Sequence, residues 1–263
     1  MASRAPRGAH GLLAFVLHRY DWSESSLILD LFTREQGRLA VAAKGAKRPY
    51  SQLRAVLLPF QRITISLGRA PDAEGAPEVQ TLRTAEWGGG AAMLTGAALF
   101  SGFYLNELLM KLLARHDPHP ALFDAYAQTL AALPKADESG GEAVLRAFEL
   151  TLLREVGVLP DLSLATLTQQ PVSASAVYDL RADAGVGVRS ADEEGGLSGA
   201  TLIALQAALE HGSLPALQQA CAAALPALKG VLRAQLHYHL GSSVLRTRRV
   251  MVQAQMLDPR GRT

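Results

Sequence analysis

A short basic segment in the first third of the chain has the residue types needed to bind phosphate. The run Lys44-Gly45-Ala46-Lys47-Arg48-Pro49 places three cations within five residues, and Arg54 follows it. The glycine lets the backbone approach a polyanion, and fixed positive charge beside phosphates releases their condensed counterions. The run therefore predicts a phosphate-binding loop, although a solvated basic loop without a partner would show the same pattern.

Two aromatic residues near this segment could contact nucleic-acid bases. Trp22 and Tyr50 are candidates for stacking, which supports single-strand binding without sequence preference. For Trp22 the alternative is a structural one, in which the ring pins its own turn onto the protein. Tyr50 is the weaker candidate of the two.

Patterns that would carry catalysis are not found in the sequence. Gly88-Gly89-Gly90 lacks the lysine of a phosphate-binding P-loop, and no Gly-x-Ser-x-Gly elbow occurs. The segment His116-Asp117-Pro118-His119 could bind a metal in principle, but it lies at an expected helix junction. The single cysteine, Cys221, excludes an intrachain disulfide and a four-cysteine metal cluster. We therefore predict no catalytic residue, no metal and no cofactor, so that the protein is not an enzyme.

The charge is distributed unevenly along the 263 residues. Residues 1–84 contain 12 Lys or Arg and 7 Asp or Glu, residues 85–230 contain 8 and 16, and residues 231–263 contain 6 and 1. Basic ends thus flank an acidic middle, which suggests an anionic partner for the ends. No apolar run reaches the roughly 18 to 20 residues that span a bilayer, and no secretory signal is evident. We expect a cytoplasmic protein without a membrane partner.

Five strand patterns are expected to position the basic loop. Alternation in Ser26–Phe32 places Leu27, Leu29 and Leu31 on one face, and Arg34-Glu35-Gln36-Gly37 has the composition of a hairpin turn. A turn is also expected at residues 20–23. Five short strands within 85 residues are typical of a small closed barrel such as the OB-fold, and an SH3-like barrel would fit the same pattern. The strands are expected at residues 10–19, 26–32, 38–43, 62–67 and 79–84.

The apolar period becomes helical after residue 90. Helices are expected over 91–115, from about 120, and over 141–156, 198–212, 214–223 and 228–240. Between them, a Ser/Thr/Ala/Gly-rich stretch has a possible hairpin over 176–188. The predicted fold class is therefore α+β multidomain, an N-terminal OB-fold β-barrel followed by an α-helical domain with a small inserted lobe. The expected parts are the barrel at 1–86, the helical domain at 87–160 and 198–251, the lobe at 161–197 and a flexible tail at 252–263.

Motifs that occur in order along the chain carry a resemblance to a known family. They include Trp22-Ser23-Glu24-Ser25-Ser26-Leu27, Ala43-Lys44-Gly45-Ala46, Ser101-Gly102-Phe103-Tyr104-Leu105-Asn106-Glu107, Leu145-Arg146-Ala147-Phe148-Glu149-Leu150 and Leu245-Arg246-Thr247-Arg248. Over about residues 12–160 and 228–251 the sequence resembles the RecO family of bacterial recombination mediators. Each motif alone is modest, but their common order is specific.

The resemblance implies a DNA-repair function. Such proteins bind single- and double-stranded DNA, anneal complementary strands and, with the partner RecR, help load the RecA recombinase. They act on strands coated by single-stranded-DNA-binding protein, whose acidic C-terminal tail docks on the helical domain. A bacterial, nucleoid-associated location would follow. Some relatives carry a four-cysteine zinc module in the segment equivalent to 161–200, where this chain has no cysteine.

The residues expected to bind DNA lie mainly in the first domain. The resemblance carries over to Lys44, Lys47 and Arg48 in the basic loop and to Arg34 and Arg38 at the adjoining hairpin, and Arg19 and Arg54 add charge. A possible secondary basic patch consists of Arg246, Arg248 and Arg249.

Two rival functions fit parts of the sequence. In the first, the chain is a protein-interaction module with an OB-like barrel, and its DNA binding is only incidental. In the second, it is a nuclease with an unrecognised carboxylate site, for which the candidates are Glu107, Glu149 and Glu155.

Overall fold

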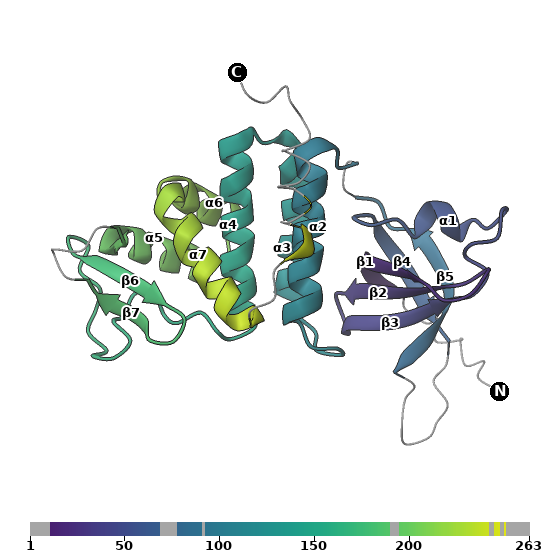
Figure 1. Ribbon diagram of the computed structural model, residues 1–263, viewed down its shortest axis with the longest axis horizontal. Helices are drawn as coiled ribbons and strands as arrows, with labels where there is room; N and C mark the ends of the chain where they lie inside the picture. Colours follow the sequence, from purple (N-terminus) through teal and green to yellow (C-terminus); the bar gives the residue numbers. More distant parts are fainter. Residues whose placement is uncertain are drawn as a thin grey trace, which may run out of the picture. The chain divides into compact units, whose positions relative to one another are not determined.

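The computed structural model describes residues 11–68, 78–90, 93–189, 195–241, 245–247 and 250 (Figure 1). These residues form two compact units. Unit 1 contains the described residues up to Met93 together with Leu113–Phe123, and unit 2 contains Leu94–Leu112 and the described residues from Asp124 onward. No helix in this described part is long and apolar enough to cross a membrane.

Unit 1 is built on a closed five-stranded barrel with strand order β1-β2-β3-β5-β4. Strands β3 and β5 pair in parallel and the other neighbours are antiparallel. This order, with a short helix between β3 and β4, is that of an OB-like barrel and confirms the predicted fold class. The elements are β1 (Leu12–Asp21), β2 (Leu27–Thr33), β3 (Gly37–Ala43), α1 (Leu53–Val56), β4 (Arg62–Leu67) and β5 (Val79–Trp87).

The barrel closes around alternating apolar residues. The predicted hairpin joins β2 to β3, and Gly37 adopts the left-handed φ of 69° that favours glycine after such a turn. The turn expected at residues 20–23 starts later, because β1 stays paired with β2 as far as Asp21. The interior of the barrel contains buried residues from all five strands: Ala14, Val16, Leu29, Leu31, Leu39, Val41, Ile63, Ile65 and Leu82.

The outer face of β1 and β2 is also buried. The ring of Phe123 lies 5.1 Å from that of Phe15 and 5.4 Å from that of Phe32, centroid to centroid. All three side chains are buried. The segment 113–123 therefore covers this face within unit 1, and β2 is buried on both sides.

Unit 2 is mainly helical, as predicted. Ser198 caps α5 by accepting a hydrogen bond from the Thr201 amide, and Gly212 ends that helix in the left-handed conformation. Helix α4 packs against α6 and α7. The helices are α2 (Gly96–Leu112), the part of α3 (Pro120–Ala132) after Phe123, η1 (Leu133–Lys135), α4 (Glu138–Glu155), α5 (Gly199–His211), α6 (Leu214–Ala222) and α7 (Leu225–Leu240).

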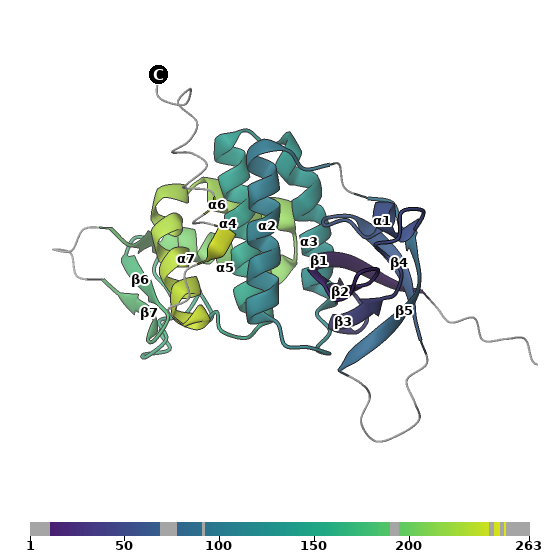
Figure 2. The same cartoon turned by 45° about the vertical axis from the view of Figure 1, so that its right-hand side comes forward.

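The inserted lobe is a small three-stranded sheet with order β7-β6-β8, and it lies beside α7 in both views (Figures 1 and 2). The strands are β6 (Val177–Arg181), β7 (Gly185–Val188) and β8 (Leu197–Ser198), and the first two form the predicted hairpin. The Gln235 amide of α7 donates a hydrogen bond to the Leu180 carbonyl and joins the lobe to the helices. Among the described residues no cluster of His, Cys, Asp and Glu is suited to a metal ion. The expectation of no zinc stays a prediction.

A carboxyl group is fully buried where α2 meets α4. The Oε1 atom of Glu149 lies 2.7 Å from Nη2 of Arg146 and accepts a 2.6 Å hydrogen bond from the Tyr104 hydroxyl. Burial raises the pKa of Glu149, and the Arg146 guanidinium and the Tyr104 hydroxyl only partly offset this effect.

We expect Glu149→Gln to change how stability depends on pH. Because the pKa of Glu149 is raised on folding, its contribution to stability is fully present below the unfolded pKa and is lost as the pH rises through the folded pKa. Glutamine has no charge to desolvate and can still accept from Tyr104. In urea titrations at a series of pH values, the free energy of unfolding of Glu149→Gln relative to wild type should therefore increase as the pH rises above the usual value of 4.5.

The matched control is Glu210→Gln, because Glu210 is an exposed carboxylate in the same unit. The free energy of unfolding of this control should differ from that of wild type by the same amount at every pH in the series. If the Glu149→Gln curve is also parallel, burial does not raise the pKa of Glu149.

Candidate nucleic-acid interface

Strand pairing gathers five of the predicted cations at one end of the barrel. Strands β2 and β3 pair Leu27 with Ala43 at this end and Thr33 with Gly37 at the other. The loop that begins at Lys44 follows directly on Ala43, and Arg19 of β1 pairs with Leu29 near the same end. Arg54 of α1 lines the same concavity as Arg19 and Lys47. We refer to Arg19, Lys44, Lys47, Arg48 and Arg54 as the basic end of the barrel.

The basic loop is held in place by its neighbours. Gly45 has a φ of 72°, and the Ala46 side chain is buried in the barrel core. The Lys47 amide donates to the Ser25 carbonyl at 2.9 Å, and the Gly45 amide donates to Oγ of Ser26 at 3.4 Å. The loop is thus fixed to the turn between β1 and β2, so its cations are presented from a defined backbone.

The charges of the basic end differ in how far they are neutralised. Lys44, Arg48 and Arg54 are exposed, and among the described residues no carboxylate lies within ion-pair distance of them. Lys47 instead pairs with Oδ1 of Asp21 at 3.0 Å and donates to the Ser23 carbonyl. These three cations are therefore available to an anionic ligand. Arg19 is also exposed, and its Nη1 donates to the Leu57 carbonyl. Lys47 bridges the loop to the end of β1.

Exposed aromatic rings accompany these cations. The exposed fractions are 57% for Trp22 and 98% for Tyr50, and Tyr50 lines a shallow concavity together with Lys44 and Arg48. Tyr20, near the end of β1, is a third exposed ring, with an exposed fraction of 46%. It was not predicted as a stacking residue from the sequence. Rings beside cations are what a single strand needs for stacking and phosphate contacts.

The two remaining cations predicted in the barrel lie at its opposite end. Arg34 belongs to the β2–β3 turn, about 20 Å from the basic end at roughly 3.3 Å per strand residue. Arg38 is at the start of β3. Both residues are close to the basic loop in sequence but lie far from it in the folded barrel. A DNA contact of Arg34 stays a prediction.

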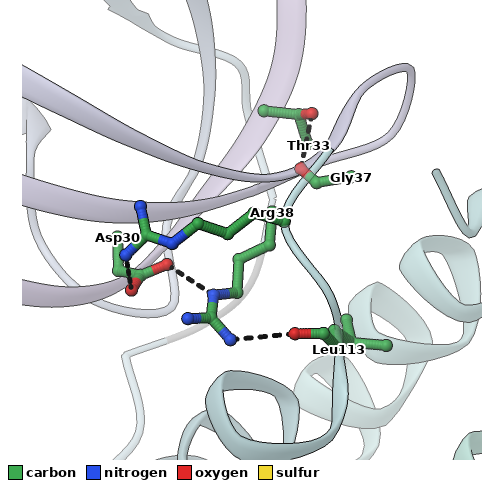
Figure 3. A network of polar contacts seen from close by, with 6 residues as sticks. Asp30, Thr33, Gly37, Arg38 and Leu113 are labelled. Carbon is green, nitrogen blue, oxygen red and sulfur yellow. Dashed lines mark hydrogen bonds and ion pairs between the residues drawn. The ribbon is translucent and has the colours of Figure 1, made fainter. Parts of the chain in front are cut away.

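Arg38 takes part in a polar network within unit 1 (Figure 3). Its Nε atom lies 3.0 Å from Oδ1 of the buried Asp30, and its Nη1 donates to the Leu113 carbonyl at 3.0 Å. Nη2 of Arg115 lies 3.7 Å from the other oxygen of Asp30. Burial raises the pKa of Asp30, and the two arginines work against that shift. Arg38 therefore joins the 113–123 segment to the barrel, and we leave it out of the proposed DNA surface.

The C-terminal basic run is described only in part. Arg246 is exposed, whereas Arg248 and Arg249 lie outside the described residues. Glu107 of α2 accepts hydrogen bonds from the amides of Arg246 and Thr247 and from the Thr247 hydroxyl. Burial alone would raise the pKa of Glu107, but these hydrogen bonds and Lys111 outweigh it and lower the pKa. Glu107 thus anchors residues 246 and 247 to α2.

Fold and site together define a class, that of proteins with an OB-like barrel, a cationic barrel end and an appended helical unit. Two family models match the chain, Recombination protein O N terminal over residues 12–87 and Recombination protein O C terminal over residues 93–249. The chain belongs to the RecO family of DNA repair proteins, as the motifs indicated.

Named relatives are similar over nearly their whole length. The DNA repair protein RecO of Polaromonas sp. strain JS666 is 50% identical over 245 residues, which cover 93% of this chain and 96% of the relative. The RecO proteins of Polaromonas naphthalenivorans and Verminephrobacter eiseniae are 51% and 50% identical, with the same coverage.

Proposed function

We propose that the protein is a recombination mediator that binds single- and double-stranded DNA through the basic end of its barrel and anneals complementary strands. The observation that carries this proposal is the set of three exposed cations without a carboxylate partner, Lys44, Arg48 and Arg54, on and beside a loop fixed by hydrogen bonds. Membership of a DNA repair family supports it.

Annealing by this surface is an electrostatic process. Two DNA strands repel each other, and cations that neutralise phosphates lower the cost of bringing the strands together. Base pairing then supplies the favourable free energy. The step needs neither a nucleotide nor a covalent intermediate, which agrees with the lack of a P-loop motif in the sequence. In this proposal the protein is not an enzyme and uses no cofactor.

The proposed partners follow from the family. The protein would act on DNA coated by single-stranded-DNA-binding protein, with the acidic tail of that partner docking on the helical unit. Together with RecR it would help RecA to load on the same strand. Its place of action would be the bacterial nucleoid.

An annealing assay tests the proposal. Two labelled complementary oligonucleotides are coated with the cognate single-stranded-DNA-binding protein and mixed with and without this protein, in the absence of nucleotide. We expect faster duplex formation that is suppressed by added salt and by deletion of the partner's acidic tail. No acceleration by a folded preparation, with partner binding retained, would favour the interaction module, whereas metal-dependent strand cleavage would indicate a nuclease.

A further inference from the structure

A concavity of about 550 Å³ opens at the basic end of the barrel. Its size lies within the range of about 300 to 1,000 Å³ that is usual for small-molecule sites. Its apolar lining comes from β2, the basic loop and the α1 region, namely Leu27, Ala46, Leu53, Leu57 and Leu58.

Charged side chains form the rest of this lining. They are Arg19, Lys47 and Arg54, with Asp21 as the single carboxylate. Nη1 of Arg19 donates to the Leu57 carbonyl at 3.3 Å, which holds the guanidinium against the concavity. Oδ1 of Asp21 pairs with Lys47, yet the Asp21 side chain remains 80% exposed and can accept further hydrogen bonds.

This combination of groups is complementary to a nucleotide. Leu27, Leu53 and Leu58 are partly exposed and offer an apolar surface to the face of a base. The arginines offer charge to the adjacent phosphates, and a carboxylate can accept from an exocyclic amino group, as it does from cytosine N4. A base in a duplex cannot enter, because its faces are stacked and its amino group is paired. An acidic peptide fits less well, because Asp21 would repel its carboxylate.

We infer that this concavity holds one unpaired base, with its face on the leucines, its phosphates at Arg19 and Arg54 and its amino group at Asp21. The inference rests on the proposed function and adds a specific site to it. Through this site the barrel would distinguish single strands from duplexes by the base as well as by the backbone.

The test compares two oligonucleotides of equal length, one of normal cytidine nucleotides and one abasic at every position. Both present the same phosphates, so the difference in their affinity reports base contacts. We expect the normal strand to bind about five- to 150-fold more tightly to the wild-type protein, the range that one stacked base contributes in single-strand binding. The salt dependence of the two affinities should be the same.

Leu58→Gln is the variant that isolates the concavity. Leu58 lines it without being part of the packed barrel core, so the fold should be retained. The variant should bind the normal strand more weakly and leave abasic binding unchanged. The matched control is Leu167→Gln, which replaces a leucine that is 88% exposed in unit 2 and should change neither affinity.

Asp21→Ala tests the hydrogen bond to the base. Wild type should prefer oligo-cytidine over oligo-thymidine, and the variant should lose this preference even though the release of Lys47 strengthens binding of both strands. Equal wild-type affinities for the two would overturn the assignment to Asp21.

The two levels of the proposal fail in different ways. Absence of salt-dependent binding to either strand would overturn the proposed function and this inference with it. Equal binding of the normal and abasic strands would overturn only the inference. It would also be overturned if an acidic peptide with an apolar C-terminus bound wild type and not Leu58→Gln while the two strands bound equally, because the concavity would then belong to a protein partner.

Discussion

Replacing Lys44, Arg48 and Arg54 together with alanine is expected to weaken single-strand binding roughly a hundredfold at 0.1 M salt. Each phosphate contact with a single strand contributes about 0.7 to the slope of log K against log salt, so three lost contacts lower the slope by about 2. At 0.1 M salt the same three contacts account for about two decades of affinity. Fluorescence anisotropy titrations with a labelled oligonucleotide at a series of salt concentrations measure both quantities.

The control for this triple variant removes charge elsewhere. Lys135 and Arg233 are exposed cations of unit 2, and among the described residues neither has a carboxylate within ion-pair distance. Their joint replacement with alanine should leave the slope unchanged. Lys47→Ala should have a smaller effect than any one of the three, because Lys47 already pairs with Asp21. If the triple variant keeps the wild-type slope, the basic end is not the DNA surface.

The elements that could be predicted from the sequence are those with a local cause. Alternating leucines in β2, the turn that ends at Gly37, and the capping residues Ser198 and Gly212 each act within a few residues of the element that they define. The basic loop could be recognised for the same reason, because its cations are contiguous. Five short strands at this spacing predict a barrel, because closing the sheet removes its exposed edges.

The role of Arg38 could not be predicted in this way. Its partners are Asp30, on the neighbouring strand, and the Leu113 carbonyl, which is 75 residues away in sequence. Only the folded chain shows that segment 113–123 covers the outer face of β2. Arg38 was therefore predicted to contact DNA because it is close to the basic loop in sequence. It lies at the start of β3, whereas the loop follows the end of that strand.

The concavity is also a product of folding. Arg19, Asp21 and Leu58 come from a strand end and a loop that are almost 40 residues apart, and the sequence around each is unremarkable. Arg19 and Arg54 could be predicted from the sequence as cations that strengthen DNA binding. Their position beside the leucines of the concavity depends on closure of the barrel. Charge could thus be predicted from composition, whereas the apolar surface beside it could not.

Phe123→Ala is expected to destabilise unit 1 by about 3 to 5 kcal/mol, the usual cost of truncating a buried phenylalanine. Phe123 is almost fully buried and contacts the rings of Phe15 and Phe32, so its removal leaves a void on the outer face of the barrel. The chain has two tryptophans, Trp22 and Trp87, and both lie in unit 1. Their fluorescence during urea titration therefore reports the unfolding of this unit.

Phe103→Ala is the matched control for this prediction. Phe103 is a partly exposed phenylalanine of α2 in unit 2, so its truncation should leave the tryptophan transition in place. Since Phe32 lies near the end of β2 remote from the basic loop, Phe123→Ala should bind DNA like wild type under conditions where it remains folded. A Phe123→Ala transition that coincides with wild type would show that segment 113–123 does not hold the outer face of the barrel. Weakened DNA binding by the folded variant would show that this face and the basic end are coupled.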